Sequence, residues 1–241
     1  MEKRIQVCII SLAHDLDRRA HASLEMKKTH FSWEFIDAVN GKELNAVPQY
    51  DAKKGRRLVG FELTHGEIGC FLSHRLVWQR CVDTQINTLV LEDDFIMLPH
   101  AEEAIKAALN HEELWEVLRL QAMVEVQCKK KASREGFDFY ENLADPLGTT
   151  AYVVKPSSAQ ALLKMSEPFI EPVDHFIENY RKHRIPVTAI KPYPIDIMHA
   201  QSTIDQPNEN RNNRKPIRGW AKAKRSIYRN IYRLLTWKSV P

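Results

Sequence analysis

The stretch Thr88-Leu89-Val90-Leu91-Glu92-Asp93-Asp94 joins a short apolar run to three consecutive carboxylates. The run predicts a buried strand, and strand alternation sends Glu92 and Asp94 to one side and Asp93 to the other. Ligands bind at the carboxyl ends of strands in open α/β sheets, where carboxylate oxygens suit a divalent cation that holds phosphate. A solvated acidic turn before a helix starting near Pro99 fits the same residues equally well, since charged strand ends are common.

Segments on both sides of this stretch alternate between strand and helix character. Residues 5–12 are almost continuously apolar, residues 15–28 carry apolar side chains at helical spacing, and residues 31–39 return to strand character. This order predicts a βαβ opening. Residues 42–61 are basic and irregular, and predict a loop that orders over a ligand.

A capping signal marks the next expected helix, over residues 63–82. Thr64 is a plausible N-cap, and Glu67 three residues later completes a capping box. Beyond the acidic stretch we expect a helix over residues 101–110 and a strand around residues 116–124. The alternation predicts an α/β fold.

Composition limits the choice of protein class. The chain has 241 residues, 44% of them hydrophobic, which is enough for the core of one domain with or without an appendage. No apolar stretch approaches the ~18 residues that span a bilayer, and Met1-Glu2-Lys3-Arg4 leads directly into a strand-like run, so the cytoplasm is the expected compartment. Without Cys-x-x-Cys spacing, four cysteines are interpreted as reduced core thiols: Cys8, Cys70, Cys81 and Cys128.

Basic residues concentrate at the end of the chain. Ten of the 35 Lys and Arg residues follow Glu209, and no acidic residue does. Residues 206–213 are polar and predict a linker, so we expect a main domain over residues 1–210 and a basic tail over residues 211–241.

The tail has the pattern of a basic amphipathic helix. Its apolar residues recur at helical spacing: Trp220, Ile227, Ile231, Leu234 and Leu235. Such a helix suits an anionic membrane surface, where each Lys or Arg contributes ~1 kcal/mol. Packing against the main domain is one alternative. Nucleic-acid binding is another, which the acidic main domain and its lack of aromatic stacking platforms disfavour.

Three later segments add polar groups to the expected sheet edge. Gly148-Thr149-Thr150 is a turn before a strand, and it either lets a sugar or phosphate approach the backbone or is an ordinary turn. Asp174 precedes a helical stretch, where it is either an N-cap or a carboxylate facing the cleft. His199 follows a strand-like segment, and is either a metal ligand or a structural histidine.

Several segments together resemble the lipooligosaccharide glycosyltransferases of glycosyltransferase family 25, which also includes the collagen galactosyltransferases. The matching segments are Ile9-Ile10-Ser11-Leu12, Asp17-Arg18-Arg19-Ala20-His21, Phe35-Ile36-Asp37-Ala38, Gly66-Glu67-Ile68-Gly69-Cys70-Phe71-Leu72-Ser73-His74 with Trp78, Leu91-Glu92-Asp93-Asp94, Arg119-Leu120, Gly148-Thr149-Thr150-Ala151-Tyr152, Val173-Asp174 and Gln201-Ser202. The resemblance covers roughly residues 5–205 in the family's order, and bacterial members have a similar basic tail.

This resemblance implies a glycosyltransferase A type fold, with a Rossmann-like nucleotide-binding mixed sheet flanked by helices. It implies transfer of galactose or glucose from a UDP-sugar to a lipooligosaccharide or lipopolysaccharide acceptor, with Mn²⁺ or Mg²⁺. The reaction would invert the anomeric centre, which needs a base on the acceptor hydroxyl. A cation at the acidic stretch would offset the charge of the leaving nucleoside diphosphate.

Residue roles follow from the same resemblance. Asp94 would hold the metal, with Glu92 and His199 as further candidate ligands, and Asp174 is the candidate base. Candidate donor-binding residues are Ser11, Leu12, Arg18, Asp37, Ala38, Ser73, His74, Glu92 and Asp93. Candidate acceptor-binding residues are Gly148, Thr149 and Thr150.

The implied setting is the cytoplasmic face of the bacterial inner membrane, with the basic tail holding the enzyme on anionic lipid. Two other functions remain open. A metal-dependent phosphohydrolase would direct the same carboxylates at water, although a two-metal site would need further clustered ligands. A catalytically silent glycan-binding protein would keep the fold for recognition alone.

Overall fold

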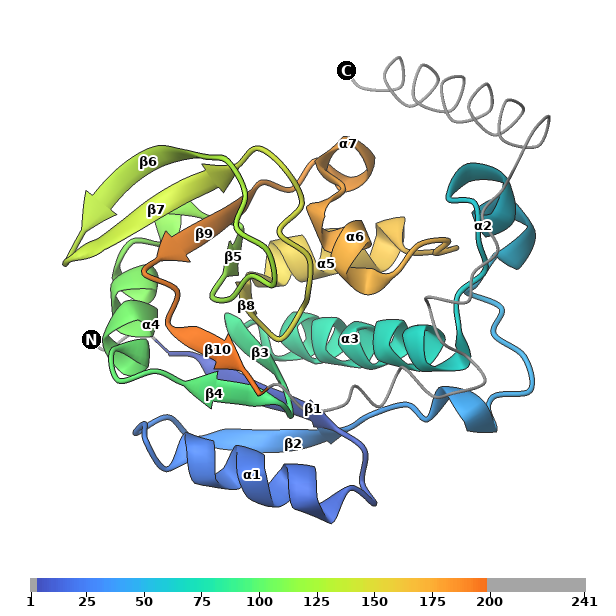
Figure 1. The fold of residues 1–241 in the computed structure, drawn as a ribbon, viewed down its shortest axis with the longest axis horizontal. Coiled ribbons are helices and arrows are strands. Elements are labelled where there is room, and N and C mark those ends of the chain that lie inside the picture. The colour runs from blue at the N-terminus through green and yellow to red at the C-terminus, as the bar shows by residue number, and fades with distance from the viewer. Residues whose placement is uncertain (1–3, 199–241) are drawn as a thin grey trace.

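A computed structural model describes residues 4–198 as a mixed α/β fold built on one large sheet (Figure 1). The strands are β1 (Gln6–Ser11), β2 (Trp33–Asp37), β3 (Thr88–Glu92), β4 (Phe95–Met97), β5 (Val117–Arg119), β6 (Cys128–Arg134), β7 (Phe137–Asn142), β8 (Ala151–Val154), β9 (Val187–Lys191) and β10 (Ile195–Ile197). Eight of them form the large sheet in the order β2-β1-β3-β8-β5-β9-β7-β6, and β10 pairs with β4 in a small second sheet.

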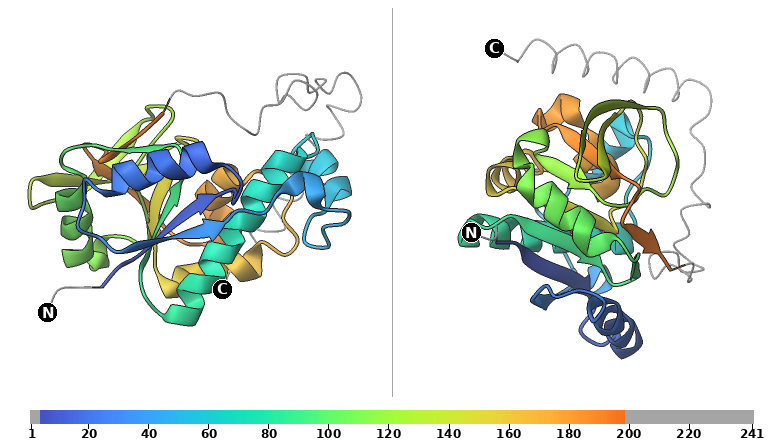
Figure 2. Two further views of the ribbon diagram at one scale, coloured as in Figure 1. Left: turned by 90° about the horizontal axis from the view of Figure 1, so that it is seen from below. Right: turned by 90° about the vertical axis from the view of Figure 1, so that its left-hand side faces the viewer.

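Helices lie on both faces of the large sheet. They are α1 (Leu16–Met26), α2 (Ala52–Leu58), α3 (His65–Thr84), α4 (Ala101–Asn110), α5 (Pro156–Met165), α6 (Val173–Glu178) and α7 (Tyr180–His183), with 3-10 turns at Gly41–Glu43 and Glu112–Leu114. Figure 2 shows the helices in two further views of the sheet. Buried residues of α1 and α4 belong to one core cluster, and those of α3, α5 and α6 belong to another. The arrangement fits the expected mixed sheet flanked by helices.

Alternation along β1 and β3 explains this layering. Val7 and Ile9 pack in the core under α1 and α4, whereas Cys8 and Ile10 pack in the core under α3. Leu89 likewise faces the first core. Both strands are buried on both faces, which is why their sequences are continuously apolar.

The predicted βαβ opening is confirmed, and it brings three strand ends to one edge. β1 pairs in parallel with β2 and with β3, with Ser11 opposite Asp37 and Ile10 opposite Glu92. The chain therefore leaves β1 toward α1 between two parallel neighbours, where the strand order changes direction. This is the position at which open α/β sheets bind ligands.

The capping box of α3 is also confirmed. The Thr64 hydroxyl accepts from Glu67 N at 3.2 Å, and a Glu67 carboxylate oxygen accepts from Thr64 N at 2.8 Å. These bonds satisfy amide groups that the first turn leaves unpaired. The cap fixes where this 20-residue helix begins, and α3 packs against the strands that carry the acidic stretch.

Two predictions about local structure are wrong. Residues 42–61 are not simply a loop, because they include α2, whose N-terminus is capped by Asp51 through a 2.9 Å bond from Lys54 N. Gly55 lies inside this helix, where an added Cβ would come within 3.1 Å of the Ile170 carbonyl oxygen. The strand expected around residues 116–124 forms, but its predicted length is wrong, because it spans only Val117–Arg119.

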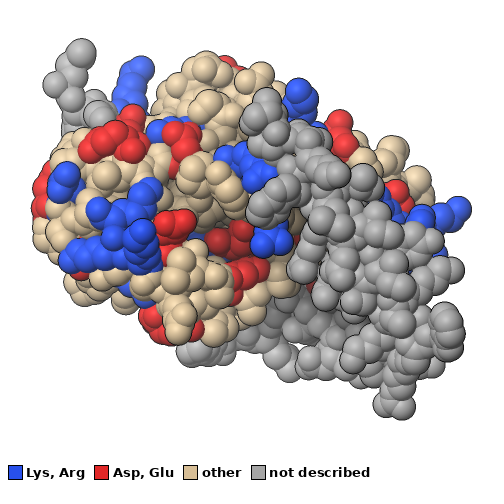
Figure 3. Space-filling view, turned by 90° about the horizontal axis from the view of Figure 1, so that it is seen from above, with Lys and Arg blue, Asp and Glu red and all other residues tan. Residues whose placement is uncertain are grey.

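The hairpin of β6 and β7 was not anticipated from the sequence. β6 reads Cys-Lys-Lys-Lys-Ala-Ser-Arg and is mostly exposed, as the last strand of the sheet. Lysines on an edge strand discourage pairing with another chain. On the face shown in Figure 3, the Lys and Arg side chains are interspersed with Asp and Glu.

The four cysteines were expected to be reduced core thiols. None of them forms a disulfide within the described residues, but only Cys8 and Cys81 are buried, whereas Cys70 and Cys128 are half-buried, so the core placement is wrong for these two. Burial raises the pKa of Cys8 to about 12. Within residues 4–198, no helix is both long and apolar enough to cross a membrane. The predicted linker and basic tail, and the boundary at residue 210, lie outside the described residues.

Candidate functional site

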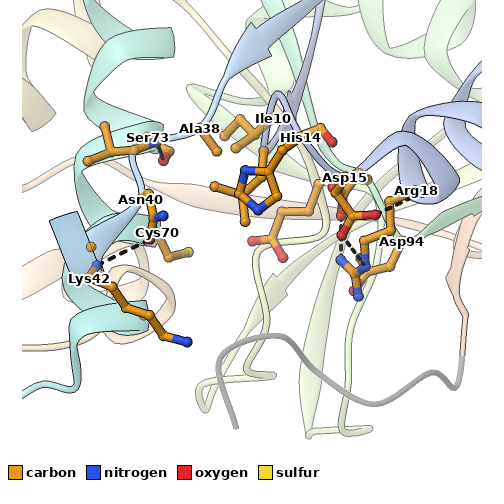
Figure 4. Close-up of a pocket in the computed structure, with 17 residues that line it drawn as sticks. Ile10, His14, Asp15, Arg18, Ala38, Asn40, Lys42, Cys70, Ser73 and Asp94 are labelled. Atoms are coloured by element: carbon orange, nitrogen blue, oxygen red, sulfur yellow. Dashed lines mark hydrogen bonds and ion pairs between the residues drawn. The ribbon is translucent and has the colours of Figure 1, made fainter. Parts of the chain in front are cut away.

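A pocket opens at the edge where β1, β2 and β3 end (Figure 4). Its walls come from the turn after β1, the first turns of α1, the segment after β2, one side of α3 and the acidic stretch. The lining residues are Ile10, Ser11, Leu12, His14, Asp15, Arg18, Ala38, Val39, Asn40, Gly41, Lys42, Gly66, Cys70, Ser73, Glu92, Asp93 and Asp94.

All three carboxylates of the acidic stretch line this pocket, which corrects the predicted alternation. The ladder of β3 ends at Glu92, and Asp93 and Asp94 lie in a turn before β4. Strand alternation does not extend into a turn, so Asp93 is not sent to the opposite side. The turn therefore places all three negative charges at the pocket instead of dividing them between the two sides of the sheet.

Glu92 is held by two hydrogen bonds to one of its oxygens. Its Oε1 lies 3.1 Å from His74 Nε2 and also accepts from the Thr149 hydroxyl. Burial acts to raise the pKa of Glu92, but these bonds and the charge of Arg18 outweigh it, so the pKa lies below its usual value. Glu92 is therefore an ionised carboxylate at neutral pH.

Asp93 and Asp94 share a single guanidinium, that of Arg18. An Arg18 Nη ion-pairs with Asp93, and the second Nη lies 3.8 Å from Asp94 Oδ2. Burial raises the pKa of Asp93. Burial and the neighbouring charges of Glu92 and Asp93 raise the pKa of Asp94 to about 7. The Arg18 guanidinium, which also lies 4.0 Å from Asp15, is thus shared by more carboxylates than it can neutralise.

This imbalance fits a divalent metal. The Oδ1 atom of Asp94 is buried and has no hydrogen-bond partner within residues 4–198. An acidic oxygen without a donor, beside two further carboxylates, is the hard donor set that Mn²⁺ and Mg²⁺ favour. A second group of potential ligands, Cys70, His74 and Glu92, has ligand atoms within 4.8 Å of one another.

The predicted donor-binding residues divide into two groups. Those that line the pocket are Ser11, Leu12, Arg18, Ala38, Ser73, Glu92 and Asp93. Ser73 also has a structural part, because its hydroxyl accepts from Val39 N at 2.8 Å and donates to the Gly69 carbonyl at 2.7 Å.

Asp37 and His74 do not line the pocket. Asp37 ends β2 with its side chain 72% exposed and paired with Arg19. His74 is fully buried behind Glu92, in contact with Tyr152. Any effect of His74 on a ligand in the pocket therefore has to pass through Glu92.

The candidate acceptor residues lie behind the acidic stretch. Thr149 contacts Glu92 directly, and the Thr150 carbonyl accepts from Glu92 N at 2.9 Å. Gly148 adopts a φ of 75°, which favours glycine, and its N–H lies 3.5 Å from Asp174 Oδ2. This loop therefore connects the metal candidate to the base candidate.

Asp174 is the second residue of α6, and Pro172 holds the N-cap position. The N-cap alternative for Asp174 is therefore wrong. Asp174 does not line the pocket itself, but it borders the Gly148 turn, half-buried, with an oxygen accepting from His175 N.

Arg119 anchors the turn and helix α6 together. It is 1% exposed, and its guanidinium donates to the Leu147 carbonyl at 2.6 Å and the Gly148 carbonyl at 2.8 Å. Its Nε lies 3.2 Å from Glu178 on α6. Burial raises the pKa of Glu178 to about 7 despite this partner.

Several pocket residues were not proposed from the sequence. His14, Asp15, Asn40 and Lys42 line the pocket, and Cys70, interpreted as a core thiol, lines it too. The signal for His14 and Asp15 was their place directly after the first strand. His199 lies outside the described residues, although Met198 before it donates to the Asp94 carbonyl at 2.8 Å.

Comparison with known proteins bears on what this site does. The model of "Glycosyltransferase family 25 (LPS biosynthesis protein)" matches residues 4–177, which hold the pocket, the acidic stretch and Asp174. The chain belongs to glycosyltransferase family 25. Its resemblance to that family is thereby confirmed.

Family 25 relatives differ in their described roles. Human procollagen galactosyltransferase 2 is 32% identical over 206 residues, covering 78% of this chain and 32% of its own length. The lipooligosaccharide biosynthesis protein lic2B of Haemophilus influenzae is 26% identical over 164 residues, covering 64% of this chain and 60% of its own. Human inactive glycosyltransferase 25 family member 3 is 29% identical over 205 residues, covering 74% of this chain and 33% of its own length. The chain spans about a third of the procollagen galactosyltransferases it matches.

Proposed function

We propose that this chain is an inverting, metal-dependent hexosyltransferase that moves galactose or glucose from a UDP-sugar to a lipooligosaccharide or lipopolysaccharide acceptor. The observation that carries the proposal is the acidic pocket at the ends of β1, β2 and β3, in which Asp94 Oδ1 has no hydrogen-bond partner among the described residues. Family 25 membership and the likeness to lic2B support it.

Donor binding falls to the residues that line the pocket. Asp94 and Glu92 would hold Mn²⁺ or Mg²⁺, with His199 as a further candidate, and the metal would offset the charge of the leaving diphosphate. Ser11, Leu12 and Ala38 follow the strand ends, where backbone groups meet a nucleotide. Arg18, paired with Asp93, is a cation at the same edge.

Asp174 is the proposed base. Inverting transfer needs a carboxylate that takes the proton of the acceptor hydroxyl, at ~3 Å, as the oxygen attacks the anomeric carbon. Asp174 borders the Gly148 turn, whose next residue, Thr149, contacts Glu92. An acceptor bound along this turn would have the base on one side and the donor on the other.

The test of the base is Asp174→Asn in the full chain. We expect the turnover of UDP-galactose or UDP-glucose onto a glycolipid acceptor, followed by mass spectrometry, to fall ~10²–10⁴-fold. Binding of UDP with Mn²⁺ should stay unchanged, because Asp174 does not line the pocket. Near-normal turnover would reject Asp174 as the base.

A catalytically silent function is the alternative favoured by one finding, the likeness to relatives described as inactive. A silent protein would bind the acceptor without consuming UDP-sugar. A hydrolase would instead release the sugar without any acceptor. Measuring sugar release and transfer side by side, with and without acceptor, separates these outcomes.

We also propose that the basic tail places the enzyme on the cytoplasmic face of the inner membrane, with no role for nucleic acid. Its charge pattern supports this. A chain ending at Asn210 should lose flotation with vesicles containing anionic lipid and keep activity on a soluble acceptor. Equal flotation of both chains would reject the membrane role.

A further inference from the structure

A series of buried side chains leads from the core to Glu92. Trp78 Nε1 donates to the Tyr152 hydroxyl at 2.8 Å, that hydroxyl lies 2.9 Å from His74 Nδ1, and His74 Nε2 lies 3.1 Å from Glu92 Oε1. Trp78 and His74 are fully buried, and Tyr152 is 1% exposed. We call Trp78, Tyr152 and His74 the buried relay.

The positions of the protons along the relay follow from which atoms are able to donate. An indole N–H only donates, so the Tyr152 oxygen accepts from Trp78. Within residues 4–198 the remaining contact of this hydroxyl is His74 Nδ1, so the hydroxyl donates its hydrogen bond to that nitrogen. A ring nitrogen that accepts carries no proton, which places the proton of neutral His74 on Nε2, facing Glu92.

We propose that the buried relay fixes His74 as the Nε2–H tautomer and thereby orients Glu92 so that one oxygen, Oε2, is presented to the pocket. His74 and Tyr152 are then positioning residues for the ligand of Glu92. The inference rests on the proposed function only for the identity of that ligand, a Mn²⁺ or Mg²⁺ ion.

Both donors to Glu92 reach the same oxygen. His74 and Thr149 occupy Oε1, and neither bonds Oε2. A cation bound to both carboxylate oxygens of Glu92 would displace His74 and Thr149 from Oε1. These buried donors would then lose their acceptor. Glu92 is thus set to give a single oxygen, which suits the octahedral shell of a small cation that keeps waters and phosphate oxygens.

The relay also decides against a different metal site. Cys70, His74 and Glu92 are close enough to bind a softer cation such as Zn²⁺. His74 would then have to bind through an unprotonated Nε2 and move its proton to Nδ1, which would leave the Tyr152 proton without an acceptor inside the core. An unsatisfied buried donor destabilises the folded protein, so the relay favours oxygen ligands in this pocket.

Two variants of His74 separate the tautomer from simple packing. His74→Gln puts an amide N–H near the position of Nε2 and keeps a donor to Glu92, whereas His74→Asn puts its polar group near Nδ1 and leaves Glu92 without that donor. Tyr152→Phe removes the proton that selects the tautomer. Each variant is compared with the wild type by Mn²⁺ titration without nucleotide and by the ¹⁵N NMR signals of the His74 ring.

We expect Nε2 to be protonated and Nδ1 unprotonated in the wild type. His74→Asn should bind Mn²⁺ ~10- to 100-fold more weakly, as for other residues that orient metal ligands, and His74→Gln should recover most of the loss. Tyr152→Phe should change the ratio of the two ring tautomers and weaken Mn²⁺ binding less than His74→Asn.

A protonated Nδ1 in the wild type would overturn the relay, as would equal Mn²⁺ affinity of the Asn and Gln variants. If the wild type shows the Nε2–H tautomer but binds no Mn²⁺, the relay stands and the proposed metal dependence fails. Loss of UDP-sugar turnover alone tests neither the relay nor metal binding, because both the ring signals and the Mn²⁺ affinity are measured without substrate.

Discussion

Replacing Asp94 with asparagine should make the metal-free protein more stable while removing its metal. Burial and the charges of Glu92 and Asp93 raise the pKa of Asp94 from 3.8 to about 7. Each tenfold change in an ionisation constant corresponds to 1.36 kcal/mol, so the ionised side chain costs the folded state ~4 kcal/mol. The pKa of about 7 already includes the attraction of the Arg18 guanidinium 3.8 Å away, so the expected gain at pH 8 is the full ~4 kcal/mol.

The pH dependence fixes the sign of this effect. Between pH 3.8 and about 7 the folded protein keeps a proton on Asp94 that the unfolded chain has lost. The stability of the wild type therefore falls as the pH rises through this window, and the penalty is constant above it. About 3 kcal/mol of the penalty develops between pH 5 and pH 8, so the gain from Asp94→Asn should fall from ~4 kcal/mol at pH 8 to ~1–2 kcal/mol at pH 5.

Urea unfolding followed by tryptophan fluorescence, in EDTA at both pH values, measures the difference. Asp83→Asn is the matched control, since Asp83 is exposed on α3 and the change should shift stability by less than ~0.5 kcal/mol at either pH. Mn²⁺ should raise the midpoint of the wild type but not of Asp94→Asn. A variant that is less stable than the wild type at pH 8, or a gain that does not depend on pH, would refute the reasoning.

Three further substitutions test other parts of the structure. Arg119→Met should destabilise the protein by ~3–5 kcal/mol in urea unfolding, because it leaves Glu178 buried without its cation; a loss below 1 kcal/mol would contradict this. Thr64→Ala removes the capping bond to Glu67 and should cost ~1 kcal/mol by the same assay, with no change in UDP binding. Thr149→Val removes one of the two side-chain donors to Glu92 Oε1 and should weaken Mn²⁺ binding ~10-fold or more, measured by titration; unchanged affinity would mean that this bond does not orient the site.

Local sequence rules were sufficient for elements with strong signals. The apolar runs of β1 and β3 and the capping box at Thr64 each act through neighbours a few residues away, and those elements form where they were expected. The approximate site was also predictable, because consecutive parallel strands of a βαβ unit end at one edge.

Contacts between distant segments explain what the sequence did not reveal. Gly55 suggested a break, but it fits inside α2 because Ile170 lies against it. The sequence around Cys70 did not distinguish it from a core thiol. In the folded protein Cys70 lines the pocket, beside the segment after β2. His74 was assigned to the donor, whereas its partner Tyr152, 78 residues later, holds it behind Glu92. No periodicity in a single segment carries such information.

Thr149 is the side chain that joins two parts of the chain at the site. Among residues 4–198, those that line the pocket lie between residues 10 and 94, and the turn, Arg119 and Asp174 all come later in the sequence. Under the proposed function, donor binding and acceptor binding therefore depend on separate stretches of the sequence. Substitutions after residue 94 that keep a hydroxyl beside Glu92 would then change the proposed acceptor region without altering a described residue that lines the pocket.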